Sequence, residues 1–124
     1  KIVETMALIG DKMDLYSGND DQIVPLLSVG GSGVISVLSN ICPVETLSMA
    51  KAALDGDFDT AAALQCQLLP LIDQLFCEVN PIPAKAAVAA MGFGTEHLRL
   101  PLTPMTAANR EKLLAVMRNL EVIV

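Results

Sequence analysis

Two short apolar stretches, each running directly into polar residues, constrain the fold of this chain most strongly. We predict strands at residues 13–16 and 34–38, separated by one helix-sized segment at residues 20–29. A strand, a helix and a second strand joined this closely form a βαβ unit, so the strands should be parallel and the crossover right-handed. Ligands of parallel α/β proteins meet the carboxyl ends of the strands, and we therefore expect the chemistry at residues 17–19 and 35–40.

Three glycines, Gly30, Gly31 and Gly33, precede the second strand and have the look of a phosphate-binding loop. They enter the strand at its amino end, however, which is the face opposite to the expected site. We therefore predict a structural role for them, with Gly33 allowing close packing or a positive φ.

Hydrophobic spacing, capping residues and breaks at proline and glycine predict six helices in total. They lie at residues 1–9, 20–29, 43–54, 57–79 and 84–91, with a last helix capped by Thr103 or Thr106. Asn19 or Asp20 is expected to cap the second helix; the alternative for Asp20 is that it orders the rim of a pocket. Asp57 would cap the fourth helix. The predicted apolar faces are Val44, Leu47, Ala50 and Leu54 in the third helix and Leu113, Val116, Met117 and Leu120 in the last.

The composition argues against several classes of function. The net charge is −6, whereas a nucleic-acid-binding protein needs a basic face to neutralise phosphates. No apolar run approaches the ~18 residues that a membrane span requires, so no membrane partner is expected. The three cysteines, Cys42, Cys66 and Cys77, have no metal-like spacing, and we expect free, buried thiols in a reducing cytoplasm.

Four strings in a fixed order carry a resemblance to a known family. They are YSGND at residues 16–20, GGSGVISVLSN at 30–40, NPIPAK at 80–85 and LRLPL at 98–102. Over essentially all 124 residues the chain resembles the later part of the dihydrodipicolinate synthase family, the pyruvate-dependent class I aldolases of lysine (diaminopimelate) biosynthesis. One departure is Asn19, where an aspartate is usual in that family.

The resemblance implies an α/β fold, the C-terminal part of a (β/α)8 TIM barrel. Residues 1–55 would hold strands 7 and 8 with their helices, and residues 56–124 a C-terminal helical subdomain. A complete barrel needs roughly 200 residues or more, so we expect this chain to be the later part of a longer polypeptide. The expected partners are the N-terminal part of the barrel and, in the complete enzyme, three further copies in a homotetramer.

The activity implied by the resemblance is that of a lyase that condenses pyruvate with L-aspartate semialdehyde through a lysine Schiff base, without a metal or organic cofactor. The family's Schiff-base lysine, tyrosine proton relay and carboxylate-binding arginine all precede the part that this chain resembles. We therefore expect no catalytic residue here and no activity of the chain alone. The expected substrate-binding residues are Gly18, which matches the glycine after strand 7, and Ile35, which matches a strand-8 residue whose carbonyl faces pyruvate.

Two alternatives remain open. One is another pyruvate aldolase of the same superfamily, of the N-acetylneuraminate lyase or keto-deoxy-sugar aldolase type. The other is a non-catalytic half-barrel that serves as an interaction module. On the residues alone, Lys85 is expected to lie on a helix surface or a subdomain contact, Tyr16 to serve in packing, and His97 to lie on the surface.

Overall fold

The computed structural model describes residues 1–124 and contains two strands and six α-helices, as predicted. In chain order the elements are α1 (Ile2–Ile9), β1 (Tyr16–Ser17), η1 (Asp20–Gln22), α2 (Ile23–Leu27), β2 (Gly33–Val34), η2 (Leu38–Asn40), α3 (Pro43–Leu54), α4 (Phe58–Leu75), α5 (Ile82–Ala90) and α6 (Ala107–Asn119). The two elements labelled η are short 3₁₀ helices. None of the helices combines the length and the apolar character that crossing a lipid bilayer demands.

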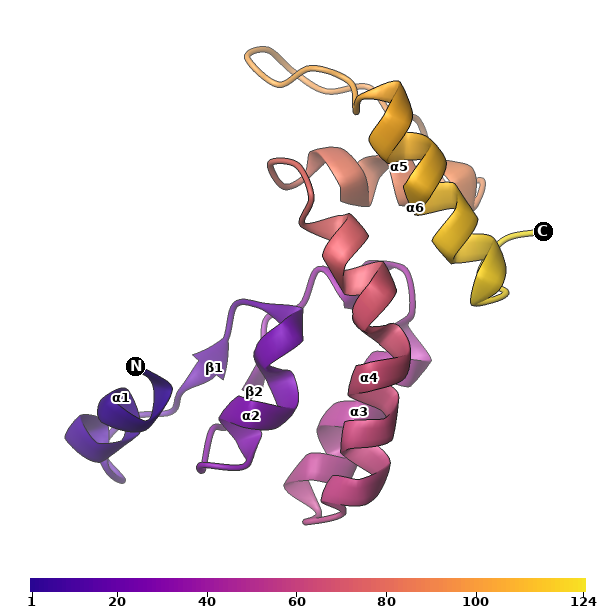
Figure 1. Cartoon of the computed structure of the whole chain (residues 1–124). Helices are drawn as coiled ribbons and strands as arrows, with labels where there is room; N and C mark the ends of the chain where they lie inside the picture. The colour runs from indigo at the N-terminus through magenta and orange to yellow at the C-terminus, as the bar shows by residue number, and fades with distance from the viewer.

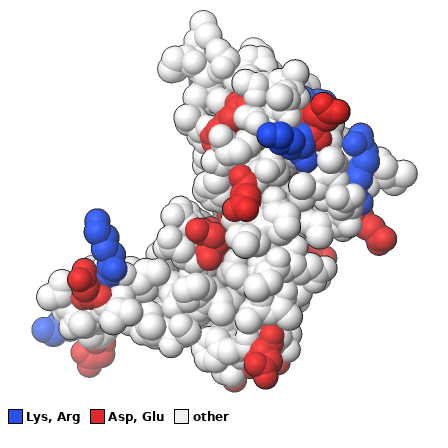
Figure 2. All heavy atoms as spheres, in the orientation of Figure 1, with Lys and Arg blue, Asp and Glu red and all other residues white.

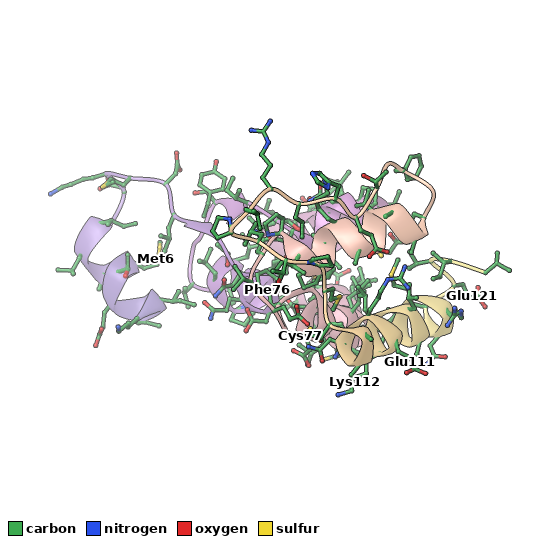
Figure 3. The ribbon with its side chains drawn as sticks, turned by 90° about the horizontal axis from the view of Figure 1, so that it is seen from above. Met6, Phe76, Cys77, Glu111, Lys112 and Glu121 are labelled. Carbon is green, nitrogen blue, oxygen red and sulfur yellow. The ribbon has the colours of Figure 1, made fainter.

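The molecule is elongated, with α1 at one end, α5 and α6 at the other, and α4 crossing between them (Figure 1). α1 ends at Gly10, whose φ of 54° lies in the left-handed region, and it contributes no buried residue. It meets the rest of the chain through Ile2, which packs against the core, and through Met6, which lies close to Gly30 and is labelled in Figure 3. The middle of the molecule therefore holds the packing, and α1 is an appendage of it.

The two strands pair in parallel, which confirms the βαβ prediction, with Tyr16 opposite Gly33 and Ser17 opposite Val34. Their predicted bounds were wrong. β1 begins three residues later than expected, and β2 ends at Val34 instead of continuing to Leu38. Close packing at Gly33 is confirmed, because an added Cβ would lie 3.0 Å from the ring of Tyr16.

A single side chain explains why the second strand does not continue to Leu38. The carboxylate oxygen Oδ2 of Asp20 accepts hydrogen bonds from the backbone N–H groups of Val37, at 3.0 Å, and Leu38, at 2.9 Å. These donors are therefore not available to a neighbouring strand, and the chain turns into η2. The prediction that Asp20 or Asn19 caps the following helix was wrong, since neither side chain makes a capping hydrogen bond there. The alternative role for Asp20, ordering the rim of a pocket, is the one the structure shows.

One hydrophobic core runs through the middle of the molecule, and α4 is its centre. α4 packs against α2, α3, α5 and α6. Its buried residues are Ala61, Leu68, Leu71, Ile72 and Leu75. As predicted, Asp57 caps α4 by accepting a hydrogen bond from the N–H of Thr60 at 3.1 Å, and the hydrogen bonds from Thr60 lower the pKa of Asp57.

The predicted apolar face of α3 is not the face that this chain buries. Val44 and Leu47 are 70% and 69% exposed and only Ala50 of that face packs against the core, whereas Thr46, Met49 and Ala53 are buried. Burial of a threonine is tolerated because its hydroxyl donates to the carbonyl of Cys42 at 2.6 Å. An apolar stripe on the other side of α3 is thus left uncovered by this chain.

Two smaller predictions also needed correction. Thr106 is the N-cap residue of α6, but its side chain makes no capping hydrogen bond and instead donates to Glu78 at 2.6 Å. All three cysteines are free, as expected, but only Cys42 is buried, while Cys66 and Cys77 are exposed. The apolar face of α6 was predicted correctly, with Leu113 and Met117 fully buried.

Candidate functional site

A cavity of about 660 Å³ opens where the strands end. Its lining residues are Gly18, Ile35, Ser36, Val37, Asn40, Asn80, Pro81, Ala84, Lys85, Val88, Phe93, Gly94 and Thr95. They form two walls. One wall follows the carboxyl ends of β1 and β2, and the other comes from the start of α5 and the loop after it.

The structure brings Gly18 and Ile35 to the same cavity, although they lie 17 positions apart in the chain. Ile35 is held by its N–H, which donates to the carbonyl of Ser17 at 2.8 Å. The residue is 72% exposed, and its own carbonyl accepts no backbone hydrogen bond from the chain. A Cβ at Gly18 would meet nothing within 4 Å, so the backbone there borders open space.

The turn after β1 is shaped by Ser17, which is buried. Its hydroxyl donates to the carbonyl of Asn19 at 2.7 Å and accepts from the N–H of the same residue at 3.2 Å. A serine turn of this kind fixes the backbone of Gly18 between the two residues. The position of Gly18 on the cavity wall is therefore set by its neighbour.

The segment after Ile35 is held by the buried carboxylate of Asp20 and by Ser36, whose hydroxyl accepts from the N–H of Ser39 at 2.8 Å. The backbone of Asp20 is itself fixed from α4. Its carbonyl accepts from the side-chain amide of Gln65 at 2.9 Å, and Gln65 Oε1 accepts from the N–H of Val24 at 3.2 Å. A chain of side-chain hydrogen bonds thus connects α4 to the strand-end wall.

The second wall was not predicted as part of the site. Asn80 and Pro81, joined by a cis peptide bond, form the corner before α5, and Ala84, Lys85 and Val88 follow on the helix. Lys85 lies on the surface of α5, as expected, and is half-buried where the helix lines the cavity. The string at residues 80–85 was one of the signals of resemblance, and that was the only hint in the sequence that this corner belongs to the site.

The corner is held to α6 by Glu78. Its Oε1 accepts from the N–H and the hydroxyl of Thr106, at 3.1 Å and 2.6 Å, and from Asn109 Nδ2 at 2.8 Å. These hydrogen bonds, led by the Thr106 hydroxyl, lower the pKa of Glu78. The beginning of α6 is therefore fixed to the chain just before Asn80.

The cavity wall has few side chains that could take part in a reaction. Lys85 is the sole charged residue among those that line it, and no histidine, cysteine or carboxylate does so. No three His, Cys, Asp or Glu side chains come together in a way that would hold a metal ion. Tyr16 does not line this cavity and lies against Gly33 in a separate hollow beside α3. The wall can bind and orient a small ligand, and the amine of Lys85 is its one ionisable side chain.

A cavity at the carboxyl ends of two parallel strands, covered by helices, defines the class as an α/β protein of the barrel or open-sheet type. The model of the Dihydrodipicolinate synthetase family matches residues 1–120. The chain therefore belongs to this family.

Relatives and a solved structure agree with this assignment. The 4-hydroxy-tetrahydrodipicolinate synthase of Alkaliphilus oremlandii is 47% identical over 123 residues, covering 99% of this chain and 42% of the relative. The protein of the same name from Caldicellulosiruptor bescii is 56% identical over 109 residues, covering 88% of this chain and 37% of the relative. A crystal structure of the Acinetobacter baumannii dihydrodipicolinate synthase complexed with pyruvate superposes with a TM-score of 0.92 at 35% identity, over 98% of this chain and 42% of that one. The chain thus spans well under half of the proteins it matches.

Proposed function

We propose that this chain is the C-terminal part of a 4-hydroxy-tetrahydrodipicolinate synthase, a cytoplasmic lyase that condenses pyruvate with L-aspartate semialdehyde. The observation that carries the proposal is that residues 1–120 match the family while Gly18 and Ile35 line one cavity. The Schiff-base lysine belongs to the part of the enzyme that this chain does not match. The chain alone is therefore inactive.

In this proposal β1 and β2 are strands 7 and 8 of a (β/α)8 barrel, residues 1–55 close the barrel, and residues 56–124 form the helical subdomain. Uncovered apolar groups support the need for the N-terminal part of the barrel. Val44 and Leu47 are exposed on α3, and each strand has only one neighbour in this chain. Unpaired strand edges and apolar stripes require a cover in a stable protein. The complete enzyme is expected to be a homotetramer.

The proposed roles of the wall residues follow from the geometry. Ile35 presents a carbonyl oxygen that is free of backbone hydrogen bonds, and a fixed dipole of this kind can accept a hydrogen bond from the carbinolamine or from the pyruvate moiety. Gly18 leaves room for the substrate, because it has no side chain and borders open space. Asp20 acts indirectly, by fixing the segment that follows Ile35.

A hybrid enzyme tests the proposal. This chain replaces the matching 123 residues of the Alkaliphilus oremlandii relative, and synthase turnover is measured together with borohydride trapping of pyruvate. We expect turnover within about tenfold of the relative, with one trapped pyruvate on a lysine of the relative's portion. The separate chain should show no trapped pyruvate by intact mass. A folded hybrid without turnover, or a stoichiometric adduct on a lysine of this chain, would refute the proposal.

The second candidate is a pyruvate aldolase that accepts a different aldehyde, such as N-acetylmannosamine or a sugar aldehyde. The names of both relatives favour the synthase. The same hybrid decides between them, since an aldolase of the other type would consume the sugar aldehyde in preference to aspartate semialdehyde. A non-catalytic interaction module would leave the hybrid able to trap pyruvate but unable to turn over any aldehyde.

A further inference from the structure

We propose that Gln65, on α4, is a positioning residue of the reaction, which sets the orientation of the Ile35 carbonyl without touching a substrate. The inference rests on the proposed function, because it takes that carbonyl as a group that contacts the reacting molecule. Gln65 itself does not line the cavity. It is connected to the cavity wall by hydrogen bonds that run through Asp20.

Both polar atoms of the Gln65 amide are used. Nε2 donates to the carbonyl of Asp20 at 2.9 Å, and Oε1 accepts from the N–H of Val24 at 3.2 Å. In an uninterrupted α-helix the N–H of residue 24 would donate to the carbonyl of residue 20. The amide therefore joins the same two backbone groups that a helical hydrogen bond would join, at the point where η1 passes into α2. The side chain thereby ties this junction to α4.

The residue that Gln65 holds by its main chain reaches the cavity wall with its side chain. Asp20 is fully buried, and its Oδ2 accepts from the N–H groups of Val37 and Leu38 at 3.0 and 2.9 Å. Its other oxygen, Oδ1, has no hydrogen-bond partner within the chain. The place of the carboxylate is therefore set by these two N–H groups and by the backbone that Gln65 holds.

The Ile35 carbonyl lies between two fixed points of the backbone. On one side the N–H of Ile35 donates to the carbonyl of Ser17 at 2.8 Å, and on the other side Asp20 holds the N–H of Val37. Only Ser36 separates these points, and the carbonyl belongs to the peptide that joins Ile35 to Ser36. A shift of Asp20 would therefore rotate this peptide. A fixed dipole stabilises a developing charge only when it points at the reacting atoms, so the rotation would slow the reaction.

The kinetic test uses the hybrid enzyme with Gln65→Met and a control, Gln67→Met, which changes an exposed glutamine of the same helix. Methionine is a good helix former with a flexible side chain, so the change removes chiefly the amide. In Gln65→Met kcat should fall about tenfold or more, because a misplacement of about 1 Å near the reacting atoms can cost about 100-fold. The KM for pyruvate should stay within about threefold. Gln67→Met should behave as the parent.

A third variant, Gln65→Glu, distinguishes a lost hydrogen bond from a lost shape. The carboxyl keeps an acceptor for Val24, but it donates to the carbonyl of Asp20 only when it is protonated. Its ionised form finds no counter-charge on α4, which has no lysine or arginine, and those on the face in Figure 2 lie toward the two ends of the molecule, over α1 and α6. Partial burial and the hydrogen bond to the carbonyl both favour the protonated form. The kcat of Gln65→Glu relative to the parent should therefore rise as the pH falls from about 8 to about 6, whereas the ratio for Gln65→Met should stay constant.

A kcat within about twofold of the parent in Gln65→Met would overturn the proposal. An equal fall in both methionine variants, accompanied by a lower melting temperature, would do the same, because that pattern indicates a general weakening of α4. The proposal also fails if the Gln65→Glu and Gln65→Met ratios are equal at every pH.

Hydrogen exchange of residues 36–41 in the hybrid, measured by mass spectrometry, requires no turnover and separates this proposal from the synthase assignment. The exchange should become about tenfold faster in Gln65→Met and stay parental in Gln67→Met, because the N–H groups bonded to Asp20 lose protection. Parental exchange in Gln65→Met would refute the link even in an active hybrid. An exchange difference in a hybrid that is folded but inactive would refute the proposed function, and the catalytic effect of Gln65 with it.

Discussion

Replacement of Asp20 by alanine should destabilise the protein and disturb the site together. The carboxylate is fully buried and accepts two backbone N–H groups, from Val37 and Leu38, at 3.0 and 2.9 Å. A hydrogen bond to a charged group contributes about 1.5–3 kcal/mol, and a buried donor left without an acceptor costs about 1–3 kcal/mol. Because η2 can relax and admit water, we expect a net loss of about 2–4 kcal/mol in the free energy of unfolding.

Two further variants sharpen the measurement. Asp20→Asn keeps one acceptor oxygen but loses the charge, so it should cost about half as much as alanine. Asp21→Ala removes the neighbouring exposed carboxylate and should change the free energy of unfolding by no more than about 0.5 kcal/mol. Urea unfolding of the hybrid gives the stability, and steady-state kinetics give kcat/KM, which should fall about tenfold or more in Asp20→Ala. A loss below about 1 kcal/mol with parental kinetics would show that the segment after Ile35 keeps its shape without this carboxylate.

Three more predictions follow from single residues. Gly31→Ala should lower the free energy of unfolding by about 1–3 kcal/mol or more, because the new Cβ would lie 1.9 Å from a buried leucine side chain. Gly18→Ala should leave the melting temperature unchanged and raise the KM for pyruvate. Thermal melts and kinetics of the two variants check this pair, and the opposite ranking would contradict it. Ile35→Val should change kcat little, since the backbone carbonyl stays in place. Ile35→Pro should abolish turnover, because the N–H that donates to the strand partner is lost. A hundredfold drop in kcat for the valine variant at constant melting temperature would assign the role to the side chain. Burial, with a nearby carboxylate, raises the pKa of Cys42 to about 11, so at pH 8 iodoacetamide should label the exposed Cys66 well before Cys42. Stability should fall as the pH rises from about 9 toward 11, because the thiol of the unfolded chain ionises first. Equal labelling of the two cysteines in peptide mass mapping would contradict the labelling prediction.

The helices could be predicted because their signals are local. Pro43 occupies the first turn of α3, Asp57 caps α4, and Gly10 ends α1 at a positive φ. Each of these residues acts on backbone groups within a few positions of itself. A sequence pattern therefore contains both partners of the interaction, and the element can be placed from the pattern alone.

The end of the second strand could not be predicted, because the group that ends it is distant. The amides of Val37 and Leu38 bond a carboxylate 17 and 18 residues earlier in the chain. An apolar, β-branched run at residues 34–38 gives no sign of this competitor. The same limitation applies to α3, where an apolar stripe and a mixed stripe were both available and the buried one is the stripe that includes Thr46.

For the candidate site, the sequence led to one wall and missed the other. Gly18 follows the first predicted strand and Ile35 lies within the second, and the resemblance together with the rule that ligands meet strand ends led to both of these cavity-lining residues. Lys85 lies on a helix in the second half of the chain, and no local pattern relates it to the strands. The packing of α5 against α4 and η2 brings the two walls together.

The hydrogen bonds of Gln65 have a consequence for how the sequence can drift over evolution. Its amide contacts main-chain atoms only, the carbonyl of Asp20 and the N–H of Val24. Every amino acid except proline offers the same two atoms, so position 24 can vary in this respect while the link to α4 survives. At position 65 the requirement falls on the side chain, which must both donate and accept over the same reach. Selection for this link should therefore act on position 65 of α4 and place no requirement on the side chains of η1 and α2.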